Sequence, residues 1–93
     1  MIYECHITTT CTFKEQAELL AKTLHWKTSE ISRDPVLGND TFFYLTTHSE
    51  DPETIFSRMR LMSQALKAAN VQVIREKIEL IIHDTKNKSA LTR

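Results

Sequence analysis

The sequence predicts an α+β fold with its elements in the order β-α-β-β-α-β. Three observations predict it: stretches of alternating polarity rich in β-branched and aromatic residues, two stretches with apolar residues at helical spacing, and few residues that interrupt regular structure. The 93 residues include one glycine and two prolines. A chain of this length forms one domain, which we place at residues 1–85, followed by a polar, frayed tail at residues 86–93.

Residues 2–10 (IYECHITTT) predict the first strand, because β-branched side chains favour extended backbone. Alternation gives this strand an apolar face and a polar face, the latter made of Glu4, His6 and Thr8. Cys5, on the apolar face, is expected to be buried. Cys11 lies about 20 Å further along an extended chain, which is too far for a disulfide. Two reduced thiols are typical of a cytoplasmic protein.

The first helix is expected to begin with Thr12 as its N-cap and to end near His25. Glu15, three residues after the cap, completes the pattern of a capping box. The buried stripe of this helix consists of apolar residues at helical spacing, namely Phe13, Ala17, Leu20 and Leu24. The pattern therefore predicts a helix that packs against the sheet by one face.

Two more strands follow the first helix. Residues 27–32 (KTSEIS) are polar and predict an edge strand, where charged side chains discourage pairing with another chain. Residues 33–40 contain Asp-Pro and Gly-Asn pairs and predict a loop. Residues 41–48 (TFFYLTTH) predict the third strand, with one face formed by Phe43 and Leu45. Its other face carries Phe42, Tyr44, Thr46 and His48.

The second helix and the fourth strand complete the domain. Asp51 is expected to cap the helix, Pro52 to occupy its first position and Asn70 to end it in the left-handed conformation. The apolar stripe, supported by Phe56, consists of Ile55, Met59, Met62, Leu66 and Ala69. Residues 71–83 (VQVIREKIELIIH) predict the last strand. Alternation assigns to its inner face Ile78, Leu80 and Ile82, and to its outer face Lys77, Glu79, Ile81 and His83.

This order of elements is that of the ferredoxin-like fold, a sandwich of a four-stranded sheet and two helices. The expected strand order is 4-1-3-2, with both helices on one face of the sheet and the other face bare. From the right-handed crossover rule we expect strands one and three, in the centre, to be parallel to each other in an antiparallel-mixed sheet. A swapped version of the same sheet, or one completed by a second copy of the chain, is the alternative topology.

The composition argues against several classes of function. Twelve basic and twelve acidic residues give zero net charge, which argues against nucleic-acid binding driven by clustered cations. Apolar runs are far shorter than the roughly 20 residues that span a bilayer, and the N-terminus lacks the pattern of a signal peptide. We therefore expect a cytoplasmic protein with no membrane partner. A single glycine also excludes the glycine-rich nucleotide-binding loops, which need two or more.

The bare face is the candidate site, because it gathers polar side chains from three strands. Matching the middles of strands one and four puts Lys77 or Glu79 opposite His6. A histidine flanked by a carboxylate and a tyrosine suits general acid–base chemistry, so the candidate catalytic residues are His6, Glu79 and Tyr44. The alternative function is an enzyme that uses His6 as general acid or base on a phosphodiester or a nucleotide-type substrate.

The preferred function is a small binding or interaction module that uses the bare face. The candidate ligand-binding residues comprise two apolar anchors, three polar residues and the glycine of the loop that rims the face: Phe42, Tyr44, Glu4, Thr8, Lys77 and Gly38. Gly38 can also serve a simple hairpin turn. The occupant of the face is a second copy of the chain in a homodimer, another protein or a small molecule. Phe42 and Tyr44 also invite comparison with RNA-recognition motifs, whose signature glycine and basic residue are absent.

No cofactor and no metal site are expected. The chain has no C-x-x-C or H-x-x-x-H spacing. With parallel central strands, His48 lies near the end of strand one, whereas His83 lies near its start. His6, His48 and His83 therefore cannot share one ion. His25 is expected at the carboxyl end of the first helix, where an imidazolium suits the helix dipole.

Short segments resemble two groups of known proteins. His6-Ile7-Thr8 resembles the His-x-Thr element of the two-histidine phosphoesterases, and residues 83–85 (HDT) match the second such element only in part. This resemblance implies an acid or base role for His6. A broader resemblance, to a family of small uncharacterised bacterial and phage proteins, is carried by YECHIT (3–8), DPVLGND (34–40), FYLTTH (43–48) and VIREKIE (73–79). It implies the fold described above and no activity.

Overall fold

The computed structural model describes residues 1–31 and 41–82. Within these ranges the elements follow the predicted order: β1 (Ile2–Thr10), α1 (Lys14–Leu24), β2 (Lys27–Ile31), β3 (Phe42–Ser49), α2 (Pro52–Ala68) and β4 (Val73–Ile81). The α+β class is therefore confirmed. The predicted loop at 33–40, with Gly38, and the predicted tail at 86–93 lie outside the described residues. The limits of the single domain at 1–85 stay a prediction.

The four strands form one sheet in the order β2-β3-β1-β4, which is 4-1-3-2 when read from the β4 edge. All neighbouring strands are antiparallel. The expectation that β1 and β3 run parallel is wrong, because each helix joins two strands that have a third strand between them. The crossover rule applies to those joined pairs, and the strand between them runs in the opposite direction. This correction changes which ends of β1 and β3 lie together.

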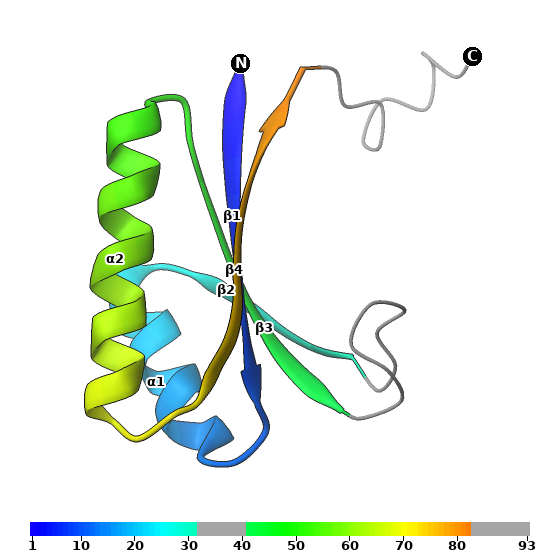
Figure 1. Ribbon diagram of the computed structural model, residues 1–93, viewed down its shortest axis with the longest axis vertical. Helices are drawn as coiled ribbons and strands as arrows, with labels where there is room; N and C mark the ends of the chain where they lie inside the picture. Colours follow the sequence, from blue (N-terminus) through cyan, green and yellow to red (C-terminus); the bar gives the residue numbers. More distant parts are fainter. Residues whose placement is uncertain (32–40, 83–93) are drawn as a thin grey trace.

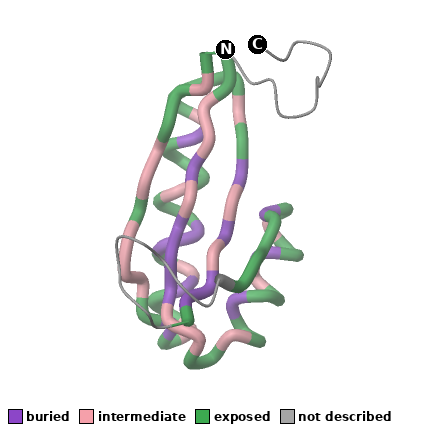
Figure 2. The backbone as a smooth tube through the Cα atoms, turned by 90° about the vertical axis from the view of Figure 1, so that its right-hand side faces the viewer, coloured by how far each residue is buried: buried purple, intermediate pink, exposed green. Residues whose placement is uncertain are grey.

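Both helices cover one face of the sheet, and the other face is open (Figure 1). The core lies between the two layers. As predicted, it takes alternate residues of the central strands, each 2% exposed or less: Cys5, Ile7, Phe43 and Leu45. The long helix α2 adds three fully buried side chains, namely Ile55, Met62 and Leu66. Figure 2 shows the resulting alternation of buried and more exposed positions along the strands.

The edge strand β4 is less buried than predicted. Ile78 packs against the core, but the other two residues of its predicted inner face, Leu80 and Ile82, are exposed. Leu80 pairs with Tyr3 near the end of the sheet, where β1 and β4 extend past the start of α2 (Figure 1). Alternation decides which face a side chain takes, whereas burial also requires another element to cover that face.

Helix α2 follows the sequence-based prediction at both ends. Oδ2 of Asp51 accepts a hydrogen bond from the backbone N–H of Thr54 at 2.8 Å, which is the geometry of an N-cap. After the helix, Asn70 adopts the left-handed conformation with φ 64°. Phe56 is 47% exposed and does not support the core as expected. Neither helix in the described ranges is long and apolar enough to cross a membrane.

Helix α1 begins differently from the prediction. The backbone N–H of Lys14 donates to the carbonyl of Cys11 at 3.2 Å, so a tight turn leads from β1 into the helix. Phe13 lies in this turn with a left-handed φ of 60°, and no side chain caps the helix. The predicted capping box of Thr12 and Glu15 is therefore wrong. Because it lies in the turn, Phe13 is 49% exposed and does not join the buried stripe.

Candidate functional site

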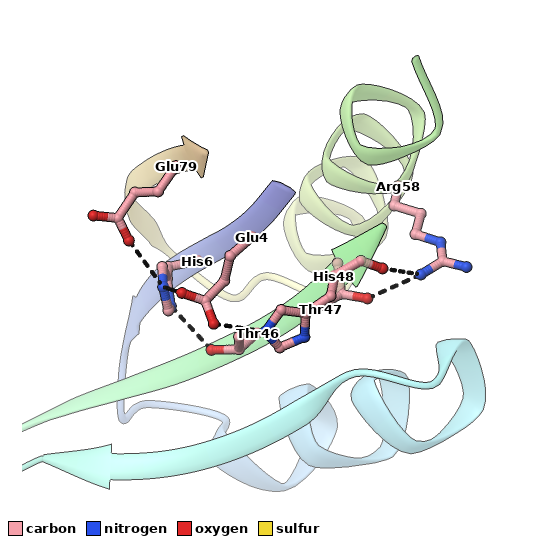
Figure 3. A network of polar contacts seen from close by, with 7 residues as sticks. All are labelled: Glu4, His6, Thr46, Thr47, His48, Arg58 and Glu79. Atoms are coloured by element: carbon pink, nitrogen blue, oxygen red, sulfur yellow. Dashed lines mark hydrogen bonds and ion pairs between the residues drawn. The ribbon is translucent and has the colours of Figure 1, made fainter. Parts of the chain in front are cut away.

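The open face carries a network of polar contacts centred on His6 (Figure 3). Nδ1 of His6 lies 3.0 Å from Oγ1 of Thr46, and Nε2 lies 2.9 Å from Oε1 of Glu4. Nε2 also lies 3.5 Å from Oε1 of Glu79. The second carboxylate oxygen of Glu4 lies 2.6 Å from Nε2 of His48. The carboxylate of Glu4 therefore contacts the imidazoles of both His6 and His48, and the imidazole of His6 contacts the carboxylates of both Glu4 and Glu79.

Strand register explains why these side chains meet. β1 pairs His6 with Lys77 of β4, so the predicted proximity of these two residues is confirmed. The next pair on the same face joins Glu4 to Glu79. On the other side of β1, the alternate residues 46 and 48 of β3 occupy the matching positions. Directly paired residues have Cβ atoms about 4.5–5.5 Å apart, so three antiparallel strands are sufficient to assemble the network.

The position of His48 corrects an expectation from the sequence. Parallel central strands would place His48 near the end of β1, but the strands are antiparallel and His48 pairs with Glu4 near its start. Arg58 of α2 supports this end of β3, because its guanidinium donates to Oγ1 of Thr47 at 3.2 Å and to the backbone carbonyl of His48 at 2.9 Å (Figure 3). His83, the third histidine considered, lies outside the described residues.

The two carboxylates of the network differ in their surroundings. Partial burial opposes the charge of Glu4, but the hydrogen bonds and charges of His6 and His48 outweigh burial and lower the pKa of Glu4 below its ordinary value of 4.5. Glu79 is more exposed, and its Oε2 lies 3.3 Å from Nζ of Lys77. The network therefore holds one shielded carboxylate and one carboxylate open to solvent.

A hollow of about 330 Å³ adjoins the network on the open face. All four strands line it, through His6, Thr8, Ser29, Tyr44, Thr46, Arg75 and Lys77. The lining thus offers two cations and four hydroxyl groups, and no carboxylate belongs to it among the described residues. Its volume lies at the lower end of the range of roughly 300–1,000 Å³ found for small-molecule sites. Its charge suits an anion.

The structure brings most of the predicted site residues together. Four of them line the hollow (His6, Thr8, Tyr44 and Lys77), and Glu4 and Glu79 belong to the adjoining network. Thr8 is only 3% exposed and therefore offers little surface to a ligand. Phe42 shares this face by alternation, but it is 7% exposed and does not line the hollow. It therefore provides no exposed apolar anchor. Gly38 lies outside the described residues.

Thr46 and His48 were expected on this face from the sequence, but Arg75 and Ser29 were not singled out. Arg75 precedes Lys77 by two residues. Alternation along β4 could therefore have identified Arg75 as well. Ser29 lacks such a signal, because its place in the lining depends on the pairing of β2 with β3, which no local pattern reveals.

No protein-family model, curated protein or solved structure matches this chain. The resemblance to small bacterial and phage proteins therefore stays a prediction, and so does the resemblance to the two-histidine phosphoesterases.

Proposed function

We propose that this protein is a small binding module that holds a small anionic molecule in the hollow on its open face. The observation that carries the proposal is the lining, which combines the cations of Arg75 and Lys77 with hydroxyl groups from the other strands. Hydrogen bonds from guanidinium and ammonium groups to phosphate are among the strongest in proteins. Tyr44 adds an aromatic ring at the same place, which suits a planar group. We therefore propose a phosphate-bearing small molecule of the nucleotide type.

The two cations play unequal parts in this proposal. Lys77 shares its charge with Glu79, from which its Nζ lies 3.3 Å away. Arg75 forms no ion pair with another residue in the ranges that the structure describes. Its charge is therefore available to a ligand, and its planar guanidinium can bind two phosphate oxygens at once. We assign the larger part of the affinity to Arg75.

Isothermal titration with pyrophosphate, AMP and adenosine tests the proposal. The two anions are expected to bind, and neutral adenosine to bind at least about tenfold more weakly, because it lacks the phosphate. Arg75→Gln is expected to weaken AMP binding by about tenfold or more. Arg60→Gln removes a matched exposed arginine on α2 and is expected to change nothing. If neither anion binds, or if both variants lose affinity equally, the proposal fails.

The alternative function is an enzyme with His6 as general acid or base on a phosphodiester or nucleotide-type substrate. Two contacts favour it: the Glu4 carboxylate orients one ring nitrogen of His6, and the Thr46 hydroxyl meets the other. Because both nitrogens are engaged, we prefer the binding module. His6→Ala separates the two functions. An enzyme loses turnover of a cyclic nucleotide and keeps its affinity for AMP, whereas a binding module has no turnover to lose.

The proposal extends to the fold family, the compartment and the oligomeric state. We assign the fold to the ferredoxin-like group, on the support of the βαββαβ order and of two helices on one face. The free Cys5 and Cys11 support a cytoplasmic location.

Homodimerisation through the open face is the competing use of this surface. Light scattering distinguishes the two uses, because a dimer formed through this face should dissociate when AMP binds.

A further inference from the structure

We propose that Glu4, His6 and Glu79 form a binding site for one divalent transition-metal ion, for which Zn²⁺ is the probe. One imidazole nitrogen of His6 and one carboxylate oxygen from each glutamate all lie within 4.8 Å of one another. Imidazole and carboxylate are ligands that zinc accepts in proteins. The proposal goes beyond anion binding in the hollow and does not depend on it. It also replaces the sequence-based expectation that the chain has no metal site.

Charge at this point of the sheet favours a cation. Glu4 and Glu79 are directly paired across β1 and β4, and like charges at directly opposed positions destabilise a sheet. Lys77 offsets part of this charge through Oε2 of Glu79. The two carboxylates together carry one more charge than the ammonium group of Lys77 offsets. A divalent cation between the two carboxylates removes that excess.

The spacing of the donor atoms is compatible with a metal's coordination shell. Nε2 of His6 lies 2.9 Å from Oε1 of Glu4 and 3.5 Å from Oε1 of Glu79. Ligands that are 2.0–2.1 Å from a tetrahedral zinc ion lie about 3.3 Å from one another. Small rotations of these side chains therefore suffice to bring the three donors to bonding distance of one ion.

Neighbouring side chains contact two of the three ligands through polar atoms, as is usual for metal-binding side chains. Nδ1 of His6 is engaged by the Thr46 hydroxyl at 3.0 Å, and Nε2 is the ring nitrogen that faces both carboxylates. The free oxygen of Glu4 is engaged by His48 at 2.6 Å. Contacts of this kind orient the ligands and contribute to metal affinity. Thr46 and His48 are therefore positioning residues for the site.

The site is shielded on one side and open on the other. The side chains of Glu4 and His6 are 21% and 25% exposed, whereas that of Glu79 is 47% exposed. An ion can thus enter from solvent, and three protein donors leave a fourth position for water or an external ligand. A metal at Nε2 takes the lone pair that acid–base chemistry at that nitrogen would need. The metal site and that form of the enzyme function therefore exclude each other.

Isothermal titration of the full chain with zinc chloride at neutral pH tests the site. We expect one ion per chain, and we expect the thermal unfolding temperature to rise with zinc concentration, because the ion binds the folded chain. Glu79→Gln keeps the size of the side chain and removes its charge, and it is expected to weaken zinc binding by about tenfold or more. His6→Ala is expected to abolish binding.

Two matched variants control for non-specific binding at the surface. Glu30→Gln removes a carboxylate of the edge strand β2, and His25→Asn removes the imidazole at the end of α1; both are expected to keep the wild-type affinity. Three results overturn the proposal: no zinc binding, half an ion per chain, or equal weakening by Glu30→Gln and Glu79→Gln. Circular dichroism verifies the folding of each variant. If His6→Ala fails to fold, Glu79→Gln still decides the outcome.

Discussion

The two faces of β1 differ sharply within a few residues. Cys5 and Ile7 are fully buried beneath the helices. Glu4 and His6 alternate with them, contact other polar side chains and keep 21% and 25% of their own exposed. The covered face holds the strands together by apolar burial. Because the same backbone carries both faces, that rigid layer also fixes the positions of the polar side chains opposite.

The largest expected effect of burial is on the reaction rates of the two cysteine thiols, because Cys5 is buried and Cys11 is only half-buried. Burial, with the nearby charge of Glu76, raises the pKa of the Cys5 thiol from 9.0 to about 12. Because the thiolate is the reacting form and the sulfur of Cys5 is buried, Cys5 should react with a disulfide reagent at least about tenfold more slowly than an ordinary thiol. The kinetics of a Cys11→Ser variant measure this rate.

The same variant in denaturant provides the control, because the reaction of Cys5 should reach the ordinary rate once the core opens. Partial burial and Glu30 also raise the pKa of Cys11, but Cys11 is only half-buried and should react in the native protein. Rapid labelling of Cys5 under native conditions would show that the helices cover β1 less tightly than the structure indicates.

Substitutions at two neighbouring residues of β3 show how much each face of the sheet contributes to the free energy of unfolding. Leu45 is fully buried, so Leu45→Ala should lower the free energy of unfolding by about 3 kcal/mol through lost burial and a cavity. Tyr44, one residue earlier, lines the open hollow, and Tyr44→Ala should cost less than about 1 kcal/mol. Urea denaturation of both variants measures the difference. Equal losses would mean that the open face is also covered.

A smaller effect than that of Leu45→Ala is expected for the polar network itself. Because the pKa of Glu4 is lowered in the folded protein, its charge stabilises the fold above the ordinary pKa of 4.5, and this contribution is lost as the pH falls through the lowered value. Glu4→Gln should therefore cost about 1 kcal/mol at neutral pH. In metal-free buffer, the difference in the free energy of unfolding between Glu4→Gln and the wild type, here called the gap, should disappear as the solution becomes acid.

Chemical denaturation over a range of pH measures that gap. In the described ranges, His6, His48 and Glu79 are the titratable groups that contact Glu4 or face it across the strands, so the comparison with the wild type measures the Glu4 charge together with its coupling to these groups. Glu50→Gln, at an exposed position next to α2, is the matched control and should follow the wild type at every pH. A gap that persists unchanged in acid would contradict the expected role of the Glu4 charge.

Much of the candidate site could be inferred from the sequence, because it depends on alternation along single strands. That pattern places Glu4 beside His6 on β1, and Tyr44 beside Thr46 on β3. It also places Lys77 and Glu79 on the same face of β4. The predicted proximity of Lys77 to His6 is confirmed by the pairing of these two residues across β1 and β4. The burial of Phe42 could not be inferred in this way, because it depends on what covers the residue rather than on the face that it takes.

The sequence by itself determined the six elements, most of their ends to within one residue and the apolar side of each central strand, because these depend on residues close together in the chain. The tertiary structure alone decided the register of β3 against β1, in which Glu4 meets His48, 44 residues away. It also decided where the helices stop covering β4 and leave Leu80 exposed. The register between strands and the burial of a side chain by another element arise from contacts between distant segments, which local periodicity does not encode.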